Sequence, residues 1–402
     1  MRGAIGADAC VGHYNWVMIY LDNNATNRLH PDVLAAMLPW LQDQYANPSS
    51  MHQFGQNARQ AMEAARYQVA SLAGCQASEV IFTSGGTEAD NAAILGVAAG
   101  APADRQTIIT SAVEHSAVRE TLACLEKRGW RIVEIPVDIS GHLNLTALEA
   151  ALRDHKAALL TIMWANNETG VLFDVNSIGN LARAHGVLFH TDAVQTAGKM
   201  PLAFAQRPID LLSISGHKFH GPKGVGALVV RRGVRWQPLI RGGPQERDRR
   251  GGTENVAGIV GMGHAAAMAA SRMSPPDGQP KVGQLRDKLE TGILHSIPES
   301  HVNGDTTHRL ANTTNIGFDG LEAEAILILL SQMDICASAG AACSSGSLEP
   351  SHVLRAMRIP ERTAHGSIRF SLSDFTTARE IQVTLEILPD IINRLRKVLP
   401  VA

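Results

Sequence analysis

Short apolar runs separated by amphipathic segments dominate the chain between residues 56 and 271. The amphipathic segments, such as 56–73 and 87–98, repeat their apolar residues at helical spacing. Runs rich in Val, Ile and Leu recur at 80–83, 107–110, 131–135, 157–163, 187–190, 209–213 and 225–230. Such runs are typical of strands that are buried on both faces. The pattern therefore predicts an α/β fold, in which a mostly parallel sheet has helices on both of its faces.

The pattern changes after residue 271. Pro275, Pro276 and Pro280 interrupt it between residues 271 and 284. Beyond this interruption, helical patterns at 288–297, 322–332 and 376–396 alternate with strand patterns at 312–318 and 367–371, which indicates a smaller α+β domain. We therefore expect three parts, namely an N-terminal extension over 1–18, a large α/β domain over 31–271, and a small domain built from 19–30 and 272–402.

The composition narrows the classes of partner. The 36 basic and 38 acidic residues give a net charge of −2, which argues against nucleic acid or an acidic membrane surface as a partner. No apolar stretch approaches the roughly 20 residues of a membrane helix. The five cysteines form no C-x-x-C pair, so we expect neither a disulfide framework nor a zinc site. A reducing cytoplasm is the expected location.

Lys218 is the residue whose position most clearly suggests a chemical role. It lies between the apolar segments 209–214 and 225–230, and Ser215, Gly216 and His217 precede it. Desolvation lowers the pKa of a lysine amine, which can then form a Schiff base with a carbonyl cofactor. The alternative is a lysine whose stem lies along the sheet while its ammonium remains in water. The residues around Lys218 leave both interpretations open.

Other polar residues follow the predicted strands, where ligands of parallel sheets bind. Asp192 ends one strand and Gln195 follows it; a carboxylate can keep a pyridine nitrogen protonated, or it can cap the next helix. His115 follows another strand, and its imidazole can stack on a flat ring, relay protons or serve structure alone. Gly86 and Thr87 begin a helix after a Gly-rich turn, which suits a phosphate or an ordinary helix cap.

A set of motifs in a fixed order carries a family resemblance. From about residue 19 to the C-terminus the chain resembles the PLP-dependent cysteine desulfurases of the NifS/IscS family, which belong to the fold-type-I aminotransferase superfamily. Around Cys343 the sequence is more similar to the NifS branch than to the housekeeping branch. The matching segments are 20–26, 47–50 with His52, 82–91, 164–170, 190–195, 215–226, 249–255, 342–352 and 365–371.

The resemblance implies a role for each matching residue at the cofactor. Lys218 would hold pyridoxal 5'-phosphate (PLP) through a Schiff base, His115 would stack on the pyridine ring, and Asp192 would pair with the ring nitrogen. Gln195 would contact the phenolic oxygen, and Asn167 would contact both cofactor and substrate. Arg369 would bind the substrate carboxylate. The phosphate would be held by Gly86, Thr87, Ser215 and His217, together with Thr253 from the other subunit of a homodimer.

Cys343 lies in a run of small residues, 338–346, which predicts a mobile loop. The run is otherwise a linker whose cysteine is incidental. The resemblance implies that the Cys343 thiolate attacks the substrate sulfur and then carries it as a persulfide. Through that persulfide, Cys343 could also serve as a transient ligand of an iron–sulfur cluster.

Seven arginines lie between residues 231 and 250. They predict an interface near Thr253 for anionic ligands or acidic partner groups. For Arg231, Arg232 and Arg235 the alternative is a solvated basic face.

The implied activity converts L-cysteine to L-alanine, with a persulfide on Cys343 and an iron–sulfur scaffold or other sulfur acceptor protein as partner. One alternative is a selenocysteine lyase or related cysteine lyase on the same fold. An alternative of another class is a non-catalytic sulfur carrier or assembly platform. Lys218, Asp192, His115 and Arg369 argue against the carrier, because a carrier needs none of them.

Overall fold

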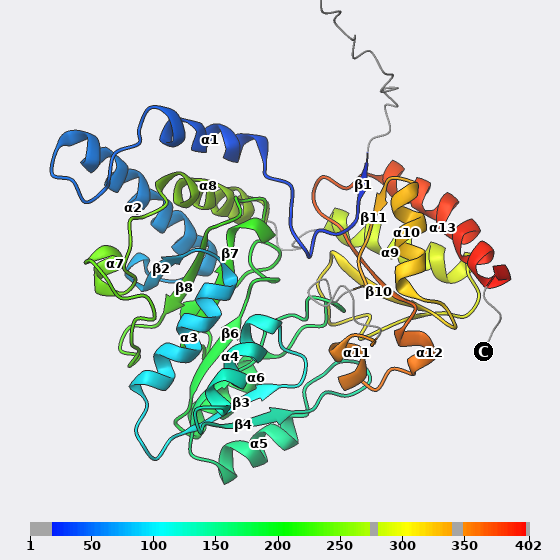
Figure 1. Cartoon of the computed structure of the whole chain (residues 1–402), viewed down its shortest axis with the longest axis horizontal. Coiled ribbons are helices and arrows are strands. Elements are labelled where there is room, and N and C mark those ends of the chain that lie inside the picture. The colour runs from blue at the N-terminus through cyan, green and yellow to red at the C-terminus, as the bar shows by residue number, and fades with distance from the viewer. Residues whose placement is uncertain (1–17, 274–279, 340–348, 399–402) are drawn as a thin grey trace, which may run out of the picture.

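The larger part of the molecule is built around a seven-stranded sheet (Figure 1). The computed structural model describes residues 18–273, 280–339 and 349–398. The strands lie in the order β2-β8-β7-β6-β5-β3-β4, and all neighbours are parallel except where β8 runs antiparallel to β2 and β7. This confirms the predicted mostly parallel sheet. The strands are β2 (Val80–Thr83), β3 (Thr107–Ser111), β4 (Arg131–Ile135), β5 (Ala157–Thr161), β6 (Leu188–Asp192), β7 (Leu211–Ser215) and β8 (Gly226–Val230).

Helices cover both faces of this sheet, because successive strand residues point to opposite sides. Ile81 packs into one core with the helices α3 (Gly86–Gly100) and α4 (Ser116–Glu126). Its neighbours Val80 and Phe82 pack into the core on the other face. That second face is covered by α2 (Gln53–Ala73), α5 (Leu145–Asp154), α6 (Val175–Ala184) and α8 (Val256–Arg272), and α1 (Pro31–Gln42) lies against α8.

A separate apolar core lies in the C-terminal part of the chain, to the right in Figure 1. It includes Ile19 and Leu21, which the parallel pairing of β1 (Ile19–Tyr20) with β11 (Ile335–Cys336) brings there from the N-terminal side. The other elements of this part are the antiparallel strands β9 (Ser300–Val302), β10 (Thr313–Phe318) and β12 (Ser367–Ser371), the helices α9 (Pro280–Ser296), α10 (Ala323–Gln332) and α13 (Ala378–Val398), and the short α11 (His352–Ala356) and α12 (Glu361–Ala364).

Two expectations from the sequence need correction. The helix expected at 288–297 begins at Pro280, because proline is tolerated in the first turn of a helix. Arg231 does not belong to a solvated basic face. It donates hydrogen bonds to the carbonyl oxygens of Phe204, Arg207 and Ile209 and lies over the Phe204 ring. None of the described helices is long and apolar enough to cross a membrane.

A buried ion pair holds the turn that leads towards Thr253. Arg66 donates to both carboxylate oxygens of Glu246, at 2.6 and 2.7 Å, and Phe82 N donates to the same carboxylate at 2.9 Å. In this turn, α7 (Gln245–Asp248), φ is 49° at Glu246, 60° at Arg247 and 63° at Asp248. Left-handed backbone at three successive non-glycine residues is strained, so the ion pair must stabilise it.

We expect Glu246→Ala to lower the free energy of unfolding by about 3–5 kcal/mol, because the buried Arg66 would lose its two-pronged partner and keep only one carboxylate, that of the half-exposed Glu63. Glu63→Ala is the matched control, since Glu63 pairs with the same arginine but is half-exposed. The control should lose less than about 1 kcal/mol. Urea denaturation at one fixed protein concentration measures both variants, and equal losses would contradict the assignment.

Candidate active site

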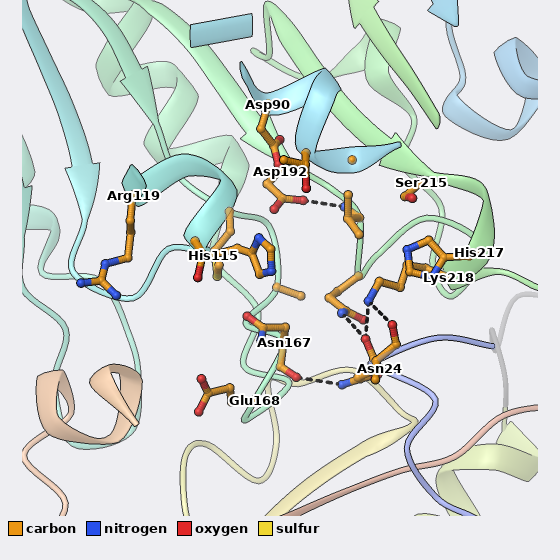
Figure 2. A pocket seen from close by; sticks show the side chains of 18 of the residues that line it. Asn24, Asp90, His115, Arg119, Asn167, Glu168, Asp192, Ser215, His217 and Lys218 are labelled. Carbon is orange, nitrogen blue, oxygen red and sulfur yellow. Dashed lines mark hydrogen bonds between the residues drawn. The ribbon is translucent and has the colours of Figure 1, made fainter. Parts of the chain in front are cut away.

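A cavity of about 530 Å³ lies where the carboxyl ends of the central strands meet (Figure 2). β6 and β7 are adjacent and parallel, so Asp192 at the end of β6 and Lys218 just beyond β7 face the same space. Except for Thr253, every predicted site residue that the structure describes lines this cavity: Gly86, Thr87, His115, Asn167, Asp192, Gln195, Ser215, His217, Lys218 and Arg369.

The Lys218 amine is held inside this space. Its Nζ donates hydrogen bonds to the carbonyl oxygens of Asn24, at 2.5 Å, and Ala25, at 2.9 Å. Both oxygens belong to the segment that follows β1, far from Lys218 in the sequence. The side chain therefore does not extend along the sheet into bulk water, and the interpretation of Lys218 as a surface lysine is wrong.

Asp192 and His115 approach the cavity from two different strand ends (Figure 2). Asp192 is buried, and burial raises the pKa of its carboxyl group, whereas the hydrogen bond from Val194 N and the charge of Lys218 lower it. One of its oxygens accepts a hydrogen bond from Val194 N at 2.8 Å. A cation placed against Asp192 would keep the carboxylate ionised.

His115 has two functions in the structure. It caps α4, where its Nδ1 accepts a hydrogen bond from Ala117 N at 3.1 Å, and its ring also lines the cavity. Burial lowers the pKa of His115, so the imidazole is neutral at neutral pH. Because Nδ1 accepts the Ala117 N–H, Nε2 carries the proton of the neutral ring, which is therefore suited to stacking on a flat cofactor and to donating a proton.

The residues at one end of the cavity fit a phosphate. Gly86 and Thr87 begin α3, whose first N–H groups have no acceptor within the helix. Ser215 Oγ is buried and has no hydrogen-bond partner among the described residues. A Cβ at Gly86 would lie 2.8 Å from Val194 Cγ2, so the close approach of the backbone here requires glycine. His217, hydrogen-bonded to Thr26 Oγ1 at 3.1 Å, completes this end.

Arg369 lies across the cavity, on β12. It is only 2% exposed, forms an ion pair with Asp22 at 2.7 Å, and donates to the carbonyl oxygen of Asn167 at 3.0 Å. The Asn24 side chain donates to the same Asn167 oxygen at 3.1 Å. These contacts join the C-terminal part of the chain to the N-terminal segment and to the loop that carries Asn167, beside the cavity.

The class-V aminotransferase family matches residues 19–383 of the chain. A cysteine desulfurase of Nostoc sp. is 53% identical over 383 residues, which cover 95% of each protein. The cysteine desulfurase NifS of Azotobacter vinelandii is 49% identical and covers 95% of this chain and 94% of its own. A solved structure titled NifS-like protein has a TM-score of 0.88 at 37% identity, covering 94% of this chain and all of its own.

The chain belongs to the cysteine desulfurase family. Its members within the class-V aminotransferases are PLP-dependent enzymes. The matches confirm the family resemblance, the fold class, the enzyme class and the cofactor expected from the sequence. The cavity fits that cofactor, since it combines an amine, an acid for a ring nitrogen and an unpartnered serine hydroxyl at a helix start.

The desulfurase cavity also contains residues that the sequence did not indicate. Asp90 and Glu88 both lie in the first turns of α3, where the helix dipole favours an acid, so the sequence alone gives Asp90 no further role. Glu88 does pair with Arg250 at the surface side, at 2.9 Å. Asp90 instead lines the cavity, and its Oδ1 accepts no hydrogen bond among the described residues, although His190 Nε2 lies 3.6 Å from it. Burial raises the pKa of Asp90 well above its usual range. Asn24 was missed as an individual residue, although the motif 20–26 contains it.

Two predicted residues do not line this cavity. Thr253 is exposed, in the loop before α8. Cys343 lies outside the described residues, as do residues 340–346 of its expected loop, most of the predicted extension over 1–18 and the proposed ligation of an iron–sulfur cluster. Ser338, where the expected loop begins, is buried and pairs with Arg369 in a β-bridge. Within the described ranges, no three His, Cys, Asp or Glu side chains are grouped so that they could hold a metal ion.

Proposed function

We propose that the chain removes sulfur from L-cysteine and leaves L-alanine, with Lys218 as the residue that binds PLP. The observation that carries this proposal is the meeting of Lys218, Asp192 and Arg369 in one cavity, each from a different element. The full-length similarity to cysteine desulfurases supplies the substrate. A non-catalytic sulfur carrier would not need these three side chains in one cavity.

PLP, when bound, supplies an electron sink for the carbanion at the substrate Cα. The residues of the chain do the remaining work. Asp192 keeps the ring nitrogen protonated, and Gly86, Thr87, Ser215 and His217 hold the phosphate. Gln195 donates to the phenolic oxygen. Lys218 Nζ, once free, takes the proton from Cα, and His115 assists the proton transfers.

Arg369 and Asn167 orient the substrate. A guanidinium donates two parallel hydrogen bonds to a carboxylate, and the buried Arg369 is positioned by its ion pair with Asp22. We expect Arg369→Lys to raise KM for L-cysteine at least about tenfold, because a lysine cannot form the paired hydrogen bonds. Steady-state alanine release measures the change. Arg362→Lys, in an exposed ion pair with Asp319, is the control and should leave KM unchanged.

Cys343 receives the sulfur. Its thiolate attacks the substrate sulfur, an S–S bond forms, and the Cβ–S bond breaks with its electron pair remaining on the carbon fragment. Protonation of that fragment gives alanine, and the sulfur stays on Cys343 as a persulfide. The run of small residues at 338–346 in the sequence supports a loop that can carry the sulfur outward.

The remaining parts of the proposal concern partners and location. We propose a homodimer in which Thr253, exposed on its own subunit, completes the phosphate site of the other subunit. The acceptor would be a scaffold for iron–sulfur cluster assembly, and the identity to NifS favours one that serves nitrogen fixation. The reducing cytoplasm is the proposed location.

Mass spectrometry after incubation with L-cysteine tests the proposal. We expect one added sulfur on the peptide that contains Cys343, together with free alanine. Alanine without any sulfur on Cys343 would contradict the proposed acceptor. Selenocysteine distinguishes the lyase alternative, since a selenocysteine lyase would turn over that substrate equally well in wild type and in Cys343→Ala.

A further inference from the structure

A second partly buried lysine, Lys199, lies beside the cavity. Residues 193–200 form consecutive turns after β6, in which Ala197 N donates to Ala193 O at 2.9 Å and Met200 N to Thr196 O at 3.2 Å. The spacing of four residues places the Lys199 side chain beside that of Gln195. Lys199 Nζ donates to Gln195 Oε1 at 2.9 Å.

Lys199 has no acidic partner in the part of the chain that the structure describes, and its neighbours are cationic. Burial, together with the charges of Lys218 and Arg369, lowers the pKa of Lys199 to about 7. The ion pair of Arg272 with Asp374 lies across a small adjoining cavity that both Lys199 and Lys218 line. A lysine placed here for stability alone would be expected to have a carboxylate beside it.

The hydrogen bonds on both sides of Gln195 allow only one orientation of its amide. Below its pKa Lys199 is an ammonium, which has no acceptor, so the charged form requires the amide oxygen. On the other side, Gln195 Nε2 donates at 3.0 Å to the carbonyl oxygen of Asn24, which has no donor. If the amide were reversed, Gln195 Nε2 would face the Lys199 ammonium, which is another donor. Gln195 Oε1 would then face the carbonyl oxygen of Asn24, which is another acceptor. The amide N–H groups of Gln195 therefore face the cavity.

The carbonyl oxygen of Asn24 also accepts the Lys218 amine, at 2.5 Å. Gln195 Nε2 and Lys218 Nζ thus meet at one atom, and Gln195 donates into the space beside the amine that binds PLP. We propose that Lys199 is a positioning residue that locks the Gln195 amide, so that its N–H is always presented to the phenolic oxygen of PLP. This inference rests on the proposed function, because it requires the cofactor to be held at Lys218.

The holoenzyme provides a spectroscopic test that is independent of activity. Donation from Gln195 favours the anionic form of the phenolic oxygen, so loss of a fixed donor should raise the apparent pKa of the pH-dependent visible band. We expect Lys199→Met to raise this pKa by about one unit. Lys199→Arg keeps a donor without an acceptor and should titrate like the wild type. Lys127→Met, which removes an exposed lysine at the end of α4, should also leave the titration unchanged.

A double-mutant cycle decides whether Lys199 acts through Gln195. If it does, Lys199→Met will cause no further shift when Gln195 is already alanine. An equal shift in both backgrounds would overturn the inference, because Lys199 would then act by its charge alone. The inference would also be overturned if Lys199→Met titrated with the same pKa as the wild type. If Lys199→Met does not hold the cofactor, Lys199→Gln takes its place in the same cycle.

Borohydride treatment of each variant keeps this test separate from the proposed function. A pyridoxyl group fixed on Lys218 in Lys199→Met, together with an unshifted titration, would overturn the inference about Lys199 and leave the proposed function intact. Failure to fix the group on Lys218 even in the wild type would remove the proposed function first.

Discussion

Replacing Lys218 with alanine is expected to lower kcat for alanine release from L-cysteine by at least about a thousandfold. Two roles are lost together in this variant, the attachment of PLP and the removal of the Cα proton. The structure gives a physical reason for the size of the effect, because the Lys218 amine is held by two backbone carbonyl oxygens at the edge of the cavity. Among the other described residues that line the cavity there is no lysine to replace it.

Single-turnover alanine formation, measured with saturating PLP, separates this loss from weak cofactor binding. Lys156→Ala is the control, since Lys156 is an exposed lysine that pairs with Asp104. It lies just before β5, at the amino ends of the parallel strands and thus away from the cavity. The control should keep its full rate. Retention of more than about a tenth of the wild-type rate in Lys218→Ala would show that another group removes the proton.

Replacing Cys343 with serine is the second change with a large expected effect. The variant should keep the visible absorbance of the bound cofactor, because no part of the proposed cofactor site includes Cys343. It should nevertheless release no alanine from L-cysteine, since a hydroxyl cannot take over the attack of a thiolate on sulfur. The expected pattern is normal cofactor binding with turnover reduced at least about a thousandfold.

Cys124→Ser is the matched control for that experiment, because Cys124 is an exposed thiol on α4. It should turn over at the wild-type rate. Full turnover in Cys343→Ser would refute the proposed nucleophile. Loss of turnover in both cysteine variants would point to general damage to the thiol groups rather than to a specific role of Cys343.

The sequence predicts the strand-end residues of the site because local pattern decides them. Asp192 and Lys218 follow consecutive buried runs, and parallel neighbours end at the same edge of the sheet. Gly86 and His115 were found in the same way, each between a strand and a helix start. These positions need no knowledge of how distant segments pack.

Residues whose importance comes from distant contacts could not be predicted from local pattern. Asn24 meets Lys218 and Gln195 through its backbone oxygen, and any residue type carries such an oxygen. Lys199 resembles an ordinary lysine in a turn until its burial beside Gln195 is known. Arg231 was misread because its partners are three carbonyl oxygens, which leave no signal in the sequence.

Borohydride reduction of the holoenzyme tests the central claim most directly. The reduced protein is digested, and mass spectrometry locates the pyridoxyl group. We predict that it lies on the peptide containing Lys218, and that Lys218→Ala carries none. A pyridoxyl group on Lys199 or another lysine, or its absence from the wild type, would contradict the proposed chemistry.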